Sequence, residues 1–128
     1  MLFLSKVIIC LLTYALTYYL NHTKKWGTVL ASSTIALIVG GMYQLAIINQ
    51  FEVEHFKTYG MIMMGATFMG MIGKAHEHKL LDFLISSLIF CTLFQHISSL
   101  FDGLGGLLGT IACISVLSVF GIDRILRK

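Results

Sequence analysis

Five long apolar runs, separated by short polar breaks, are the feature that most constrains the fold of this chain. A helix needs roughly 20 apolar residues to cross the hydrocarbon core of a bilayer. The sequence is 57% hydrophobic and 12% charged, it has no proline, and its mean hydropathy is +0.87. This balance excludes soluble enzymes, nucleic-acid-binding modules, disordered chains and disulfide scaffolds. The sequence therefore predicts an all-α, polytopic integral membrane protein.

The runs predict a bundle of about five transmembrane helices that forms a single domain over residues 1–128. Open strand edges are not tolerated in lipid, and runs of this length in so small a chain cannot close a barrel. The expected helices cover residues 2–20, 28–49, 58–73, 82–101 and 105–121. The sixteen residues between Lys57 and Lys74 rise only about 24 Å. We therefore expect the third helix to be short or re-entrant.

The distribution of basic residues predicts the orientation, because short cytoplasmic loops concentrate lysine and arginine. If five helices cross in alternation, seven of the nine basic residues fall on one side. This places the N-terminus outside and the C-terminus in the cytoplasm, in the plasma membrane. If the third run re-enters, the bias is again seven to two, with both termini inside. We favour the crossing helix, because Lys57 and Lys74 bracket the third run as two anchors would.

The first run resembles a secretory signal in having Lys6 ahead of an apolar stretch, but no small-x-small cleavage site follows it. It ends in TYALTYYLNH, whose tyrosines Tyr14, Tyr18 and Tyr19 we interpret as an interfacial aromatic belt. We therefore expect this run to remain as the first transmembrane helix.

Polar residues gather on one side of two expected helices. At 100° per residue, one half of the fourth helix carries Ser87, Cys91, Gln95, Ser98 and Asp102, with His96 in the adjoining sector. The second helix shows a weaker pattern, in which Ser33 and Gln44 share one half. Polar groups are not left facing hydrocarbon, so these halves face protein or water. They predict either a polar path between the second and fourth helices or ordinary hydrogen bonding between packed helices.

Small residues predict close helix packing. Ala66, Gly70 and Gly73 line one face of the third run, and Gly105 with Gly109 forms a GxxxG pattern at the start of the fifth. Such spacing lets helix backbones approach closely, within one bundle or between subunits.

No metal or cofactor site is expected. Five of the seven methionines lie in the third run, and thioethers are ligands for Cu(I). However, no two of these methionines are four residues apart, and Lys74 and Lys79 flank the nearby His76 and His78. Only His96 lies inside an expected span, whereas a bis-histidine haem needs two facing histidines. The methionines are interpreted as adaptable packing residues.

The middle of every expected span lacks Asp, Glu, Lys and Arg, which disfavours proton- or sodium-coupled transport. We expect no enzymatic activity and no nucleic-acid partner. The first hypothesis is a homo-oligomeric channel or passive transporter, in which Gln44, Gln95 and His96 converge on an internal or inter-subunit cavity. The alternative is a non-catalytic accessory, assembly or lysis-type subunit that binds partner membrane helices through its glycine-rich faces.

Overall fold

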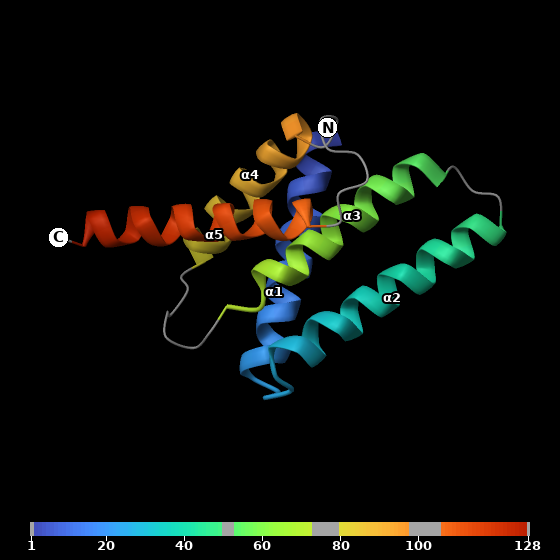
Figure 1. Ribbon diagram of the computed structural model, residues 1–128, viewed down its shortest axis with the longest axis horizontal. Helices are drawn as coiled ribbons and strands as arrows, with labels where there is room; N and C mark the ends of the chain where they lie inside the picture. Colours follow the sequence, from blue (N-terminus) through green and yellow to red (C-terminus); the bar gives the residue numbers. More distant parts are fainter. Residues whose placement is uncertain (1, 50–52, 73–79, 98–105, 128) are drawn as a thin grey trace.

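A computed structural model describes residues 2–49, 53–72, 80–97 and 106–127. Within these ranges all the regular secondary structure is helical, as the apolar runs predicted. The helices are α1 (Leu2–His22), α2 (Thr28–Ile48), α3 (Val53–Met69), α4 (Leu80–Ile97) and α5 (Leu107–Leu126). Helices α2 and α3 lie side by side in opposite directions, whereas α1 crosses both of them steeply (Figure 1).

Four of the helices, α1, α2, α4 and α5, are long and apolar enough to cross a membrane. Each has 18 to 21 residues, which corresponds to about 27–32 Å of helix. The hydrocarbon core of a typical bilayer is about 30 Å thick. The chain is therefore a small membrane protein built from helices.

The third helix is displaced from its expected position. It begins five residues earlier than expected, at Val53, and ends four residues earlier, at Met69. Hydropathy indicates which residues are soluble in lipid, but it does not indicate where a helix begins. The Glu, His, Phe and Lys near the start of α3 are polar or interfacial residues that can all take part in a helix.

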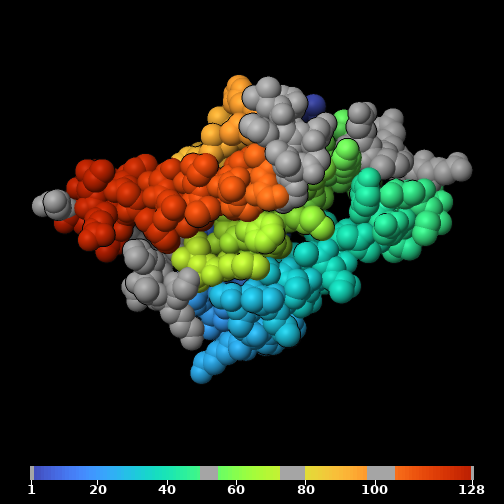
Figure 2. All heavy atoms as spheres, in the orientation of Figure 1, coloured from blue at the N-terminus to red at the C-terminus, as the bar shows by residue number. Residues whose placement is uncertain are grey.

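The short helix α3 is also the central one. It packs extensively against α1, α2 and α5 and more lightly against α4. Figure 2 shows α3, in green, between α5 and the pair α1 and α2 on the face in view. Helix α2 packs against α3 and α1, and within the described ranges it does not contact α4.

Two glycines of α3 permit its close contacts. A Cβ at Gly65 would lie 2.7 Å from Cε2 of Phe90 on α4 and closer still to its Cζ. A Cβ at Gly70 would lie 2.6 Å from Cγ2 of Thr17 on α1. Because such approaches are shorter than van der Waals contact, neither position has room for a side chain without movement of its neighbour.

Much of the surface is apolar, and several polar side chains are inside. Exposed side chains include Leu4, Leu12, Leu37 and Leu80, each more than 60% exposed. The buried polar residues include Thr17, Ser86, Ser87 and Ser115. In a bilayer, large apolar residues can face lipid, whereas polar groups need partners within the protein.

Candidate functional site

Helix α1 turns a polar face toward the interior. Its buried residues are Val7, Cys10, Thr13, Tyr14, Thr17 and Asn21. Steps of three and four residues place them on one side of the helix. Only Val7 among them is aliphatic, while leucines and isoleucines occupy the exposed side. The first helix therefore supplies a buried polar face along most of its length.

Helix α4 lies against this face in an antiparallel register. The rings of Tyr14 and Phe83 have centroids 4.5 Å apart, and those of Tyr18 and Phe83 are 5.2 Å apart. One turn further toward the N-terminus of α1, Cys10 therefore lies beside Ser87 and Cys91 of α4. The Tyr14 hydroxyl faces Ser86.

We call Cys10, Tyr14, Ser86, Ser87 and Cys91 the α1–α4 polar cluster. All five residues are buried, with at most 2% of each exposed. Lys6 lies near Cys91 at one end of the cluster, and Asp82 lies near Tyr14 at the other. The cluster itself contains no Asp, Glu, Lys, Arg or His.

Three hydroxyls of this cluster, Tyr14 Oη, Ser86 Oγ and Ser87 Oγ, make no hydrogen bond of good geometry. Each nevertheless has a polar neighbour across the contact, because Tyr14 faces Ser86 and Ser87 faces Cys10. Leaving a buried donor or acceptor unsatisfied costs about 1–3 kcal/mol. Such groups are exceptions in native proteins, and water or a ligand is a common explanation.

Many serine and threonine hydroxyls in the described ranges behave differently. Eleven serine and threonine hydroxyls donate to a carbonyl of their own helix, three or four residues earlier, at 2.7–3.2 Å. Buried Ser115, for example, donates to the carbonyl of Ile111 at 2.7 Å. Ser86 and Ser87 instead lie at the contact with α1 and do not make this bond. Ser86 lies beside the Tyr14 hydroxyl and Ser87 beside the Cys10 thiol, so both serines can pair across the contact.

Polar contacts hold α1 against α3 and the residues that follow it, on either side of the cluster. Near the start of α1, Ser5 Oγ and Tyr59 Oη are 3.0 Å apart. At its end, His22 Nε2 lies 3.1 Å from the carbonyl oxygen of Ile72. These contacts fix the helix whose polar face forms the site.

The expected pore residues separate into three groups. Ser87 and Cys91 belong to the α1–α4 polar cluster, and Gln95 and His96 are exposed near the end of α4. On α2, Gln44 is exposed, and exposed Ser33 donates to the carbonyl of Leu30 at 3.2 Å. Ser98 and Asp102 lie outside the described residues. Since α2 and α4 do not touch in the described part of the chain, Gln44 and Gln95 do not meet inside one subunit.

The expected packing residues also differ in their surroundings. Ala66 is fully buried, and Gly70 lies against Thr17 of α1. Gly109 of α5 borders a hollow and has no atom near its missing side chain. Gly73 and Gly105 lie outside the described residues. The small residues in and just after α3 that the structure describes therefore already pack against other parts of the same chain.

Sequence reasoning missed the polar face of α1 and the close approach at Gly65. The spacing of Cys10, Thr13, Thr17 and Asn21 was the available signal for the polar face. Tyr14 was assigned to an interfacial belt together with Tyr18 and Tyr19. In the structure Tyr14 is fully buried, and only Tyr19 is strongly exposed.

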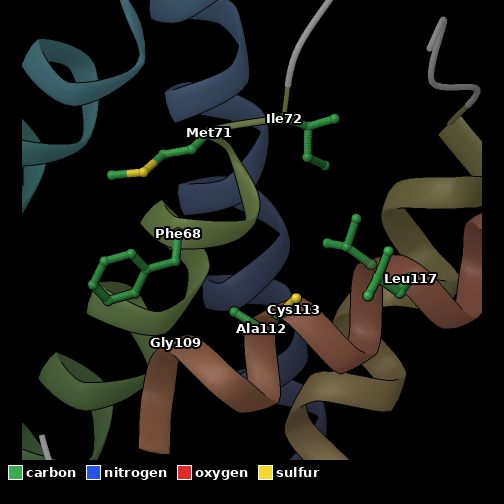
Figure 3. Close-up of a pocket in the computed structure, with 8 residues that line it drawn as sticks. Phe68, Met71, Ile72, Gly109, Ala112, Cys113 and Leu117 are labelled. Carbon is green, nitrogen blue, oxygen red and sulfur yellow. The ribbon is translucent and has the colours of Figure 1, made fainter. Parts of the chain in front are cut away.

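Two hollows lie outside the polar cluster, and both are largely apolar. One, of about 310 Å³, lies among α1, α2 and α3 and includes Val39, Tyr43 and Met63. The other, of about 220 Å³, lies between the end of α3 and the first half of α5 (Figure 3). Lipid chains suit such surfaces, and within the described residues no three His, Cys, Asp or Glu side chains gather as a metal site.

Comparison with known protein families, with curated proteins and with solved structures finds no match in any of the three. The chemistry of the α1–α4 contact is therefore the basis for a functional proposal.

Proposed function

We propose that this protein is a channel or passive transporter whose polar path follows the contact between α1 and α4. The observation that carries the proposal is the set of buried hydroxyls on this contact, which face polar side chains of the neighbouring helix rather than carbonyls of their own. A polar solute that meets these groups can exchange hydrogen bonds with them, which lowers the cost of taking it out of water.

The order of residues along α4 supports a path rather than an isolated pocket. Ser87, Cys91 and Gln95 follow one another at intervals of four and so share one side of the helix. The first two are buried and Gln95 is exposed, which is the order expected from an interior to a mouth. The partner of this face is α1, in place of the second helix that the sequence favoured.

The neutrality of the cluster supports passive movement. A coupled carrier usually places an ionisable carboxylate or base in the middle of a span. Here Lys6 and Asp82 stand near the two ends of the cluster, and hydroxyls and thiols lie between them.

A second candidate function is that of an accessory subunit that binds partner helices. The observation favouring it is the open surface of α2, where Gly40 and Gly41 have nothing within reach of an added side chain and Gln44 is exposed nearby. Small residues beside a polar one suit close contact between membrane helices. A second copy of the chain would serve equally as the partner.

Flux measurements on purified protein in lipid vesicles test the first proposal. Vesicles containing the protein are expected to pass a small solute faster than protein-free vesicles. Ser87→Leu is expected to abolish the excess flux, because a leucine would fill the space that faces Cys10. Thr92→Leu is the matched control, since Thr92 lies on the exposed side of the same helix.

Failure of wild-type vesicles to pass ions, water or small neutral solutes would contradict the channel proposal. Co-purification of one membrane protein at fixed stoichiometry, lost in Gly40→Leu, would then favour the accessory function.

A further inference from the structure

We infer that the hollow among α1, α2 and α3 binds one acyl chain of a phospholipid, whose headgroup lies at the end of the hollow near the C-terminus of α2. The hollow has a volume of about 310 Å³. Sites for small molecules usually have volumes of roughly 300–1,000 Å³. Since a methylene group takes nearly the volume of a liquid water molecule, roughly 30 Å³, the hollow accommodates about ten methylene groups. This inference is independent of the proposed channel.

The hollow follows the antiparallel contact between α2 and α3 (Figure 1). A Cβ at Gly60 of α3 would lie 3.8 Å from Cγ1 of Val39 on α2, which shows how the two helices are aligned. The lining residues of α3 extend from His55 to Met63, which corresponds to about 12 Å of helix. Because α2 is long and apolar enough to cross the membrane, its C-terminal end and the nearby His55 lie toward the membrane surface. The hollow therefore leads from the surface toward the interior, as an acyl chain does.

The walls of the hollow are apolar and its rim is exposed. Val39 and Met63 line it, and Gly60 contributes no side chain. At the rim, Met42 is 60% exposed and Phe56 is 46% exposed. Exposed apolar side chains of a membrane protein face lipid, so the hollow opens toward acyl chains. An apolar cavity stays free of water, and an empty one lacks van der Waals contacts along its walls. A hydrocarbon chain from the bilayer supplies those contacts.

Polar groups lie at the surface end of the hollow. Tyr43 of α2 and His55 of α3 line it there, together with Tyr59. The Tyr59 hydroxyl already has a partner, since its Oη lies 3.0 Å from Ser5 Oγ. Tyr43 is half-buried and His55 is exposed, and both carry a hydrogen-bond donor. The phosphate and ester oxygens of a phospholipid are acceptors, so these two side chains suit a headgroup whose chain occupies the hollow.

The hollow between α3 and α5 lacks this combination. It is smaller, about 220 Å³, and no tyrosine or histidine is among its lining residues. A chain entering it would have no such donors for its headgroup. We therefore assign the phospholipid to the hollow beside α2.

Native mass spectrometry of the delipidated protein in detergent, titrated with palmitoyl-oleoyl phosphatidylglycerol, tests the inference. Wild-type protein is expected to retain one lipid per chain under activation that removes loosely attached lipid. Gly60→Leu is expected to weaken binding at least tenfold, which is the effect of excluding about two buried methylene groups. Gly121→Leu on α5 is the matched control and is expected to bind as wild type does, because nothing lies within 4 Å of a Cβ added there.

A double variant tests the polar end of the hollow. Tyr43→Phe with His55→Leu removes both donors and leaves apolar side chains in their place. It is expected to weaken phosphatidylglycerol binding about five- to tenfold, the effect of losing a hydrogen bond of ordinary strength. Unchanged binding in this variant would overturn the assignment of the headgroup.

A second measurement needs no variant. A phosphatidylglycerol with a photoactivatable diazirine in its acyl chain is reconstituted with the wild-type protein, and the cross-linked peptides are identified by mass spectrometry. Cross-links are expected to concentrate in the peptides that contain Val39 and Met63. Cross-links spread evenly over the exposed faces of all the helices would overturn the inference, even if the variants failed to fold.

Other occupants of the hollow would give different results. Palmitate that binds as tightly as phosphatidylglycerol would assign the hollow to a free fatty acid and overturn the phospholipid. A dimer of the wild-type chain that Gly60→Leu abolishes would mean that a second copy fills the hollow. Wild-type protein that retains no lipid would overturn the inference outright. None of these results depends on solute flux, which tests the proposed function separately.

Discussion

Replacing Gly65 with alanine tests the packing of α3 at its tightest point. The added Cβ would lie 2.7 Å from one carbon of the Phe90 ring and 3.3 Å from another, with a third nearer still. Phe90 is fully buried and stacks on Phe94 with centroids 6.2 Å apart, so its ring has little freedom to move away. Overpacking of this kind costs about 1–3 kcal/mol.

Two opposing effects decide the net change. Alanine gains about 1 kcal/mol over glycine in a helix interior. The clash exceeds this gain because Phe90 cannot retreat, so we expect Gly65→Ala to destabilise the protein by about 1–2 kcal/mol. Gly40→Ala on α2 is the matched control, because nothing lies within 4 Å of its added carbon. It is expected to stabilise the protein by up to about 1 kcal/mol.

Reversible unfolding in mixed micelles, followed by circular dichroism, measures both changes. The two alanine variants are expected to shift the unfolding midpoint in opposite directions. Phe90→Leu introduced into Gly65→Ala is expected to restore part of the lost stability, because leucine vacates the far edge of the ring. Equal or greater stability of Gly65→Ala relative to wild type would refute the reasoning, as would shifts of the same sign at Gly65 and Gly40.

Three further predictions follow from the placement of particular residues. Tyr14→Phe is expected to destabilise the protein by about 1 kcal/mol, measured by the same unfolding assay, because its buried hydroxyl faces Ser86 of α4; a more stable variant would mean that the two hydroxyls do not pair. Maleimide in mild detergent is expected to label exposed Cys113 well before buried Cys10 and Cys91, as mass spectrometry of peptides would show; equal labelling would contradict the burial of the two thiols. Tags inserted in residues 23–27, which lie inside if the third helix crosses and outside if it re-enters, are expected to be protected from impermeant reagents in intact cells; labelling there would contradict the proposed crossing of the third helix.

The existence of the helices could be predicted from sequence, because apolar runs of about 20 residues have few alternatives in lipid. The limits of α3 could not be predicted in the same way. Its first residues, from Val53 to Lys57, are polar enough to look like a loop but contain nothing that stops a helix. Hydropathy and helix formation are separate properties, and they diverge at the membrane surface.

The candidate site was only partly predictable for a different reason. Helical periodicity correctly places Ser87 and Cys91 on the same side of one helix, and both are buried. Periodicity does not say which neighbour that side meets, and the neighbour is α1 rather than α2. The role of Tyr14 was missed because a tyrosine suits both a membrane interface and a buried hydroxyl cluster.

The central position of α3 has a consequence for how the protein is assembled. With 17 residues, α3 is the shortest described helix, and it is the one not long and apolar enough to count as a candidate span. Yet it contacts all four of the others. A segment that lipid alone accepts poorly is best inserted where helices already in the bilayer receive it. The order of synthesis supplies this condition, because α1 and α2 precede α3 and form much of its contact surface. Deleting α1 should therefore leave α3 outside the membrane during biogenesis, even though the sequence of α3 is unchanged.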